Sequence, residues 1–178
     1  VLFLGAGSAA TGIAHLIADA MAEEGLPREE ALKRIALVDS KGMVSSRRAD
    51  TLAANKLPFA HDLPLAGNLL DAVKVFKPTA IIGVSAQPKT FTKEVIEEMS
   101  ALNERPIIFA LSNPTSKAEC TAAEAYQWSD GRAIFASGSP FAPVSFGGKT
   151  FVPRQGNNSY VFPGIGLGCV IAQPTMIP

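Results

Sequence analysis

The sequence has little cysteine, no excess of either charge and no long hydrophobic run. Its 178 residues include 2 cysteines, too few for a disulfide framework, which favours an intracellular protein. Lys and Arg together number 16, as do Asp and Glu, so neither nucleic acid nor an anionic membrane is an expected partner. The longest weakly polar stretch, residues 161–172, is too short to span a bilayer and contains a proline and three glycines.

The residues that build metal sites and hydrolase triads are also scarce. His15 and His61 have no further histidine at ligand spacing, and Cys120 and Cys169 belong to no metal-binding motif. No order of residues suggests a Ser/His/Asp set. We therefore interpret His15 as a partly buried structural residue and Cys169 as a core residue.

What the sequence does have is an alternation of strand-like and helix-like segments. Hydrophobic residues make up 47% and charged residues 18%, as in a globular domain. We expect strands at residues 1–4, 35–38, 80–84, 106–111 and 133–136, and helices at 8–24, 68–76, 92–99 and 118–126. This alternation predicts an α/β fold, a Rossmann-type doubly wound, mostly parallel sheet with helices on both faces.

The remaining chain is organised differently. Gly147 and Gly148 predict a hairpin turn, and residues 161–172 predict one more strand-to-helix unit. We assign residues 1–172 to one nucleotide-binding domain and residues 173–178 to a truncated or divergent tail, where Pro174 would stop a helix. Because the first four residues already form a strand pattern beginning with Val1, we expect the chain to be part of a longer protein.

A glycine-rich turn directly follows the first predicted strand. Gly5, Gly7 and Ala10 fit the pattern G-x-G-x-x-A, with Gly12 two residues later. In this pattern the first glycine makes the tight turn and the second admits a diphosphate to the helix N-terminus. Ala10 and Gly12 would let the helix pack closely on the sheet. A plain strand-to-helix turn that binds nothing is the alternative, but the strand before and the helix after favour dinucleotide binding.

Asp39 ends the second predicted strand, where a carboxylate accepts hydrogen bonds from an adenosine ribose. The alternative is an aspartate that caps a turn before Gly42. The densest group of cationic residues in the chain follows closely, and it comprises Lys41, Arg47, Arg48 and Lys56, with the hydroxyl of Ser40 beside them. This composition suits a 2′-phosphate and favours NADP, although a solvated basic loop would look the same.

Three asparagines follow later strands. Asn113 ends the fourth predicted strand, where it would reach a nicotinamide ribose or a substrate carboxylate; an Asn-Pro turn explains it equally well. Asn157 and Asn158 lie in an amide-rich turn that lines a polar cleft or simply reverses the chain.

Six strings, taken together and in order, resemble the NAD(P)-binding domain of malic enzymes, most closely of the NADP-dependent branch. They occupy residues 5–12, 38–42, 103–115, 118–121, 131–141 and 155–164, and the resemblance covers residues 1–171. It implies that Gly5, Gly7, Ala10 and Asp39 hold the diphosphate and adenosine, that Ser40 and Lys56 meet the 2′-phosphate, and that Asn113 and Asn158, with Asn157 adjacent, contact malate or nicotinamide. Arg154 replaces a glycine that is usual in the family.

The resemblance further implies oxidative decarboxylation of (S)-malate to pyruvate and CO2. Hydride passes from C2 of malate to NADP, and a Mg2+ or Mn2+ ion polarises the oxaloacetate carbonyl for decarboxylation. The family's catalytic Tyr and Lys and its metal ligands lie N-terminal to this domain, so we expect no catalytic or metal-binding residue here. The chain alone is then expected to bind cofactor weakly and to show no turnover.

Other interpretations stay open. The chain would also suit an NAD-dependent malic enzyme, a non-catalytic module that binds or senses dinucleotides, or another Rossmann oxidoreductase such as an amino-acid dehydrogenase. The family forms dimers and tetramers, so a homo-oligomer is expected of the full-length protein. We expect the cytoplasm as its compartment, with plastid and mitochondrion left open.

Overall fold

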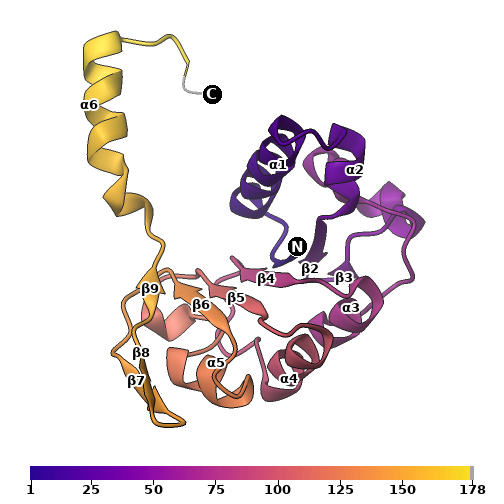
Figure 1. Ribbon diagram of the computed structural model, residues 1–178. Coiled ribbons are helices and arrows are strands. Elements are labelled where there is room, and N and C mark those ends of the chain that lie inside the picture. Colours follow the sequence, from indigo (N-terminus) through magenta and orange to yellow (C-terminus); the bar gives the residue numbers. More distant parts are fainter. Residues whose placement is uncertain (177–178) are drawn as a thin grey trace.

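A seven-stranded sheet runs through the chain in the order β3-β2-β1-β4-β5-β6-β9, in a computed structural model that describes residues 1–176 (Figure 1). The strands are β1 (Leu2–Leu4), β2 (Ala36–Asp39), β3 (Gly42–Met43), β4 (Ala80–Gly83), β5 (Ile107–Ala110), β6 (Ile134–Ser137) and β9 (Arg154–Gln155). Only β3 is antiparallel to its neighbour; every other neighbouring pair is parallel. The predicted Rossmann-type, mostly parallel sheet is therefore confirmed.

Helices cover both faces of the sheet (Figure 1). On one face lie α1 (Ser8–Glu23) and α2 (Arg28–Lys33), and on the other lie α3 (Leu69–Phe76), α4 (Lys93–Leu102) and α5 (Ala122–Trp128). Four 3-10 turns complete the connections: η1 (Ser46–Thr51), η2 (Ala54–Phe59), η3 (Thr115–Lys117) and η4 (Asn158–Tyr160).

Two separate cores follow from the alternation of side chains along each strand. Leu2 and Leu4 of β1 join the core beneath α3, α4 and α5, whereas Phe3 joins the core beneath α1 and α2. Strand β2 repeats the pattern, because Val38 belongs to the first core and Leu37 to the second. Strands that are buried on both faces read as continuous apolar runs, which is why the sequence revealed them.

Capping residues set where the helices begin. Asn68 and Thr92 accept hydrogen bonds from the backbone at the start of α3 and α4, which places both helices close to their predicted positions. The prediction that a helix starts at residue 118 is wrong, since Thr121 and Glu124 form a capping box and α5 begins at Ala122. Residue Ala118 lies instead in a buried loop.

The predicted hairpin is confirmed. Strands β7 (Val144–Phe146) and β8 (Lys149–Phe151) pair antiparallel around Gly147 and Gly148. Both glycines have positive φ, at 57° and 73°, as a two-residue hairpin turn requires.

Beyond β9 the chain leaves the sheet. Residues 158–172 form η4 and then α6 (Phe162–Ala172), so the predicted strand in this stretch is absent. Figure 1 shows α6 projecting away from the sheet, and its large apolar residues are exposed. The helix ends at Ala172, and its C-cap residue Gln173 has φ 44° and lies directly before Pro174. Of the predicted tail, residues 177–178 lie outside the described residues.

The prediction that Cys169 is a core residue is wrong, because it lies half-buried on this projecting helix. His15 is half-buried as expected, and its ring lies 4.9 Å from that of Phe59. Within residues 1–176, no helix combines the length and the apolar character that crossing a membrane requires.

Candidate functional site

The strand order reverses at β1, which has β2 on one side and β4 on the other. In doubly wound sheets ligands bind beyond the carboxyl ends of the strands at such a point. A cavity of about 400 Å³ lies there, lined by Leu4, Gly5, Ala6, Gly7, Val38, Asp39, Ser40, Lys56, Val84, Ser85 and Gln87. The structure therefore brings five of the predicted site residues, namely Gly5, Gly7, Asp39, Ser40 and Lys56, to one cavity.

The glycine turn connects β1 to α1 beside this cavity. Gly5 has φ +119°, and a Cβ atom on it would lie 3.0 Å from the carbonyl oxygen of Val84. Gly7 is the N-cap of α1, is exposed, and has no atom within 4 Å of the position of a Cβ. The first-turn N–H groups of α1 lack intrahelical partners and carry the positive end of the helix dipole, which suits an anionic diphosphate.

Two further residues of this motif have different surroundings. Ala10 is fully buried in the core between α1 and the sheet, so it allows close packing and does not line the cavity. The prediction that Gly12 also allows close packing is wrong. It lies on the exposed side of α1, with nothing within 4 Å of the position of a Cβ.

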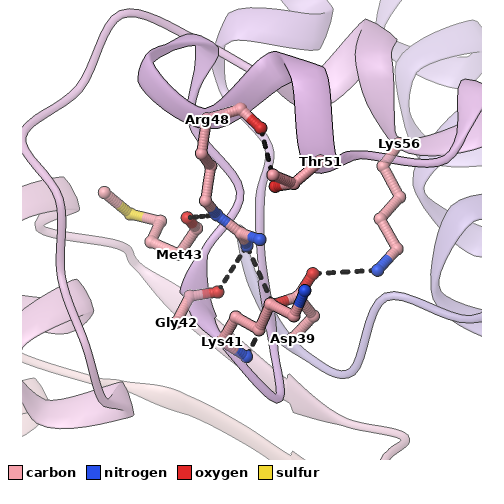
Figure 2. A network of polar contacts seen from close by, with 7 residues as sticks. All are labelled: Asp39, Lys41, Gly42, Met43, Arg48, Thr51 and Lys56. Atoms are coloured by element: carbon pink, nitrogen blue, oxygen red, sulfur yellow. Dashed lines mark hydrogen bonds and ion pairs between the residues drawn. The ribbon is translucent and has the colours of Figure 1, made fainter.

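Asp39 is the centre of a cluster of charged groups at the end of β2 (Figure 2). Its Oδ1 lies 2.8 Å from the Arg48 guanidinium and its Oδ2 lies 2.8 Å from the Lys56 ammonium group. The backbone N–H of Lys41 also donates to Oδ1, at 2.9 Å. With one carboxylate and two cations, the three side chains carry a net charge of +1 beside the cavity.

The protonation of Asp39 reflects two opposing effects. Burial disfavours the charged carboxylate, but hydrogen bonds from Lys56, Arg48 and the Lys41 backbone favour it. The donors outweigh burial, and the pKa of Asp39 lies below its ordinary value of 3.8. The carboxylate is therefore ionised at neutral pH and holds both cations.

The two arginines of the predicted basic group have different roles. Arg48 also donates to the carbonyl oxygens of Met43 and Gly42, each at 2.9 Å, and so attaches η1 to β3 (Figure 2). Arg47 points elsewhere and forms an exposed ion pair with Asp62 at 3.1 Å. Sequence proximity alone gave no means of separating the two.

A second polar cluster joins the ends of β5, β6 and β9. The Ser139 hydroxyl donates to Oδ1 of Asn113 at 2.7 Å. The Gly138 carbonyl accepts from the side-chain amides of Asn157, at 2.9 Å, and of Gln155, at 3.1 Å. Two of the three predicted asparagines thus belong to one hydrogen-bonded group at the carboxyl edge of the sheet.

The third asparagine lies at the rim of this cluster. Asn158 is exposed at the start of η4, and its backbone carbonyl accepts from the N–H of Val161. The predicted contacts of Asn113, Asn157 and Asn158 with malate or nicotinamide stay predictions.

Sequence reasoning did not include the loop after β4 in the site. Val84, Ser85 and Gln87 line the cavity because β4 is the neighbour of β1 across the reversal of strand order. The sequence did contain a signal for this loop. In a doubly wound sheet the strand after β2 and β3 is expected to return to the other side of β1, which places the end of β4 beside the glycine turn. No comparable pattern in the sequence indicates that Glu119 is buried nearby.

Residues 1–176 contain no group of three or more His, Cys, Asp and Glu side chains positioned to hold a metal ion.

Comparison with known proteins agrees with this geometry. A family model described as malic enzyme, NAD binding domain, matches residues 1–178. The chain is 60% identical over 172 residues to an NADP-dependent malic enzyme of Vitis vinifera, covering 96% of this chain and 29% of the relative. It is 59% identical to the chloroplastic NADP-dependent malic enzyme 4 of Arabidopsis thaliana and to the chloroplastic enzyme of Zea mays, covering 27% of each.

The fold comparison points the same way. A solved structure of a protein assigned as a malic enzyme (malate oxidoreductase) superposes with a TM-score of 0.68 at 25% identity, covering 99% of this chain and 40% of that one. The chain thus spans less than a third of the length of the grapevine, Arabidopsis and maize relatives.

Proposed function

The chain belongs to the malic enzyme family, whose NAD-binding domain it matches, and from this membership we propose that it binds NADP within a longer malate-oxidising enzyme. That enzyme would convert (S)-malate to pyruvate and CO2. Since the relatives are more than three times longer than the matched region, the activity of the whole protein is part of this proposal.

One observation carries the choice of NADP over NAD. Both oxygens of Asp39 are occupied by cations, Arg48 and Lys56, at 2.8 Å each, and Asp39 and Lys56 line the cavity beside the exposed Ser40. A free carboxylate at this position would accept from the ribose hydroxyls and repel a 2′-phosphate. A carboxylate neutralised by two cations instead presents a net positive group to a dianion.

The proposal also includes roles for the other predicted site residues. Gly5, Gly7 and the N-terminus of α1 would hold the diphosphate, while Ala10 would keep α1 close to the sheet. Asp39, Ser40 and Lys56 would bind the adenosine 2′-phosphate, and Asn113, Asn157 and Asn158 would orient nicotinamide or malate. When bound, NADP supplies the acceptor for the hydride from C2 of malate.

The rest of the enzyme would come from outside this chain. The family resemblance implies that the catalytic Tyr and Lys and the ligands for Mg2+ or Mn2+ would be supplied by other parts of the longer protein. We further propose a homo-oligomeric enzyme inside the cell. Chloroplastic relatives add the plastid to the cytoplasm as a compartment to test.

The test is a calorimetric titration of the 178-residue chain with NADP+ and NAD+, repeated with Lys56→Ala. We expect NADP+ to bind more tightly than NAD+, and Lys56→Ala to weaken NADP+ alone by about tenfold. Lys93→Ala is the matched control, because Lys93 forms an exposed ion pair with Glu97 on α4. A folded chain that binds neither nucleotide would contradict the proposal.

A further inference from the structure

We propose that Glu119 is a positioning residue for the cofactor, joining the loop after β4 to the loop after β5 at the edge of the dinucleotide cavity. This inference rests on the proposed function, because it concerns the same cavity. It assigns a role to a buried carboxylate that contacts neither the glycine turn nor the Asp39 cluster.

Glu119 contacts both loops at once. Its side chain is 0% exposed and lies between η3 and α5. Oε1 accepts from the Ser112 hydroxyl, at 2.5 Å, and from the Ser85 backbone N–H, at 3.4 Å. Oε2 accepts from the Ser112 backbone N–H, also at 3.4 Å. The Ser112 oxygen in turn accepts from the Ala86 N–H at 2.9 Å, so the two loops share one hydrogen-bonded group.

Glu119 has no cationic partner among the described residues. Its hydrogen-bond partners are two backbone N–H groups and one hydroxyl, all of which can donate to its carboxyl oxygens. Among residues 1–176 no Lys, Arg or His forms an ion pair with it. A glutamate is rarely buried completely without such a partner, so an apolar side chain would suit packing alone better.

The sheet makes room for this carboxylate. A Cβ atom on Gly83, the last residue of β4, would lie 2.3 Å from Cδ of Glu119. Only glycine at this position lets the carboxylate reach the ends of β4 and β5 together. The arrangement therefore depends on two residues far apart in the sequence.

The loop that Glu119 supports faces the cofactor cavity. Ser85 and Gln87 line that cavity, and Ala86 between them has φ +55°, a left-handed conformation that is unfavourable for alanine. The hydrogen bond from Ala86 to Ser112 holds this conformation. On the other loop, Ser112 directly precedes Asn113, the residue proposed to orient nicotinamide or malate.

Glu119→Gln is an informative variant because it keeps the size and removes an acceptor. If the new amide nitrogen takes the place of Oε1, it faces the Ser85 N–H; if it takes the place of Oε2, it faces the Ser112 N–H. In either orientation one backbone donor loses its acceptor, which is a costly loss in a buried site. The loops should therefore move relative to each other while the rest of the fold remains.

Two measurements on the 178-residue chain test the inference. Calorimetric titration of Glu119→Gln should give about tenfold weaker binding of both NADP+ and NAD+, with their ratio unchanged. This differs from Lys56→Ala, which should change the ratio. Amide hydrogen exchange by NMR should be faster at Ser85, Ala86 and Ser112, and unchanged in the core of α1.

Ser112→Ala is a second, milder variant that keeps the carboxyl group of Glu119. It tests the positioning role of Glu119 if the Glu119→Gln variant does not fold. It should give the same pattern with a smaller loss of affinity. Glu124→Gln is the matched control, since it makes the same change from carboxylate to amide on the neighbouring α5, where the amide oxygen still accepts from Thr121, without touching either loop.

The two proposals fail in different ways. Unchanged binding by a folded Glu119→Gln variant, or exchange that rises equally throughout the chain, would overturn the inference and leave the NADP proposal intact. If Glu119→Gln does not fold, unchanged binding by Ser112→Ala overturns the inference. A folded unsubstituted chain that binds neither nucleotide would overturn both.

Discussion

The ammonium nitrogen of Lys56 lies 2.8 Å from Oδ2 of Asp39, although the two residues are 17 positions apart in the chain. The contact joins η2 to the end of β2, and only 21% of the lysine side chain and 11% of the aspartate side chain are exposed. A lysine that would otherwise extend into solvent is thereby fixed beside the cavity. Because Asp39 holds the Lys56 ammonium group in place, binding of a phosphate at this site would depend on Asp39 as much as on Lys56.

Arg48→Ala should destabilise the domain much more than Arg47→Ala, its neighbour in the sequence. The Arg48 side chain is 14% exposed and pairs with the mostly buried Asp39, so its removal leaves a buried charge with one partner fewer. We expect a loss of about 2–3 kcal/mol for Arg48→Ala and below about 0.5 kcal/mol for the exposed Arg47→Ala. Urea unfolding of both variants measures this, and equal losses would contradict the role given to Arg48.

The contribution of Asp39 to stability should depend on pH. Its pKa in the folded chain lies below the ordinary 3.8, because hydrogen bonds from Lys56 and Arg48 outweigh burial. The stabilisation is therefore present above pH 3.8 and is lost as the pH falls through the folded pKa. We expect the parent chain to exceed Asp39→Asn in free energy of unfolding by about 2 kcal/mol at pH 7, and by less near pH 3. A difference that is constant between these pH values would show that the carboxylate charge contributes nothing.

The parts of the fold that the sequence predicts well are those governed by local pattern. The parallel strands β1, β2, β4, β5 and β6 are short apolar runs. The first glycine turn is recognised by its position between a strand and a helix. The start of α5 was missed because Ala118 and Glu119 are good helix formers, yet the burial of residues 118–120 outweighs this local preference. Propensity is local, whereas this burial depends on contacts across the sheet.

The same distinction, between local pattern and contacts across the sheet, applies to the residues of the candidate site. Gly5 and Asp39 are identified by their place after a strand, which a single sequence reveals. The different roles of Arg47 and Arg48 depend on which side of a 3-10 turn each faces, and the position of Ser85 depends on strand order. These are properties of the assembled sheet, so no local pattern contains them.

The two cysteines should differ in their reaction with a maleimide. Burial raises the pKa of the Cys120 thiol, and the residue is enclosed beneath the loops, whereas Cys169 is half-buried on the projecting α6. The folded chain should therefore take up one label rapidly at Cys169 and a second only in denaturant, as measured by intact mass. Cys169→Ser is the control and should remain unlabelled when folded. Rapid double labelling of the folded chain would contradict the burial of Cys120.

Helix α6 should make the isolated chain self-associate. Its apolar side chains are 51–74% exposed at Phe162, Ile165, Leu167, Val170 and Ile171, and so many exposed large apolar residues on one helix are unusual in water. We expect the apparent mass of the chain to rise with concentration in sedimentation velocity, and Val170→Glu with Ile171→Lys to return it to that of a monomer. The melting temperature should change little, because α6 lies away from the sheet (Figure 1).

The matched control for this experiment is Leu16→Glu on α1. Leu16 is 71% exposed, as much as Val170 at 72%, but it is a single apolar residue with mostly polar or half-buried neighbours on α1. If total exposed apolar area drives association, Leu16→Glu should reduce it in proportion; if α6 is the surface involved, Leu16→Glu should have no effect. We expect the second result, because apolar contacts stabilise association only where enough side chains pack together to exclude water. Association that persists in the α6 double variant would place the contact elsewhere on the domain.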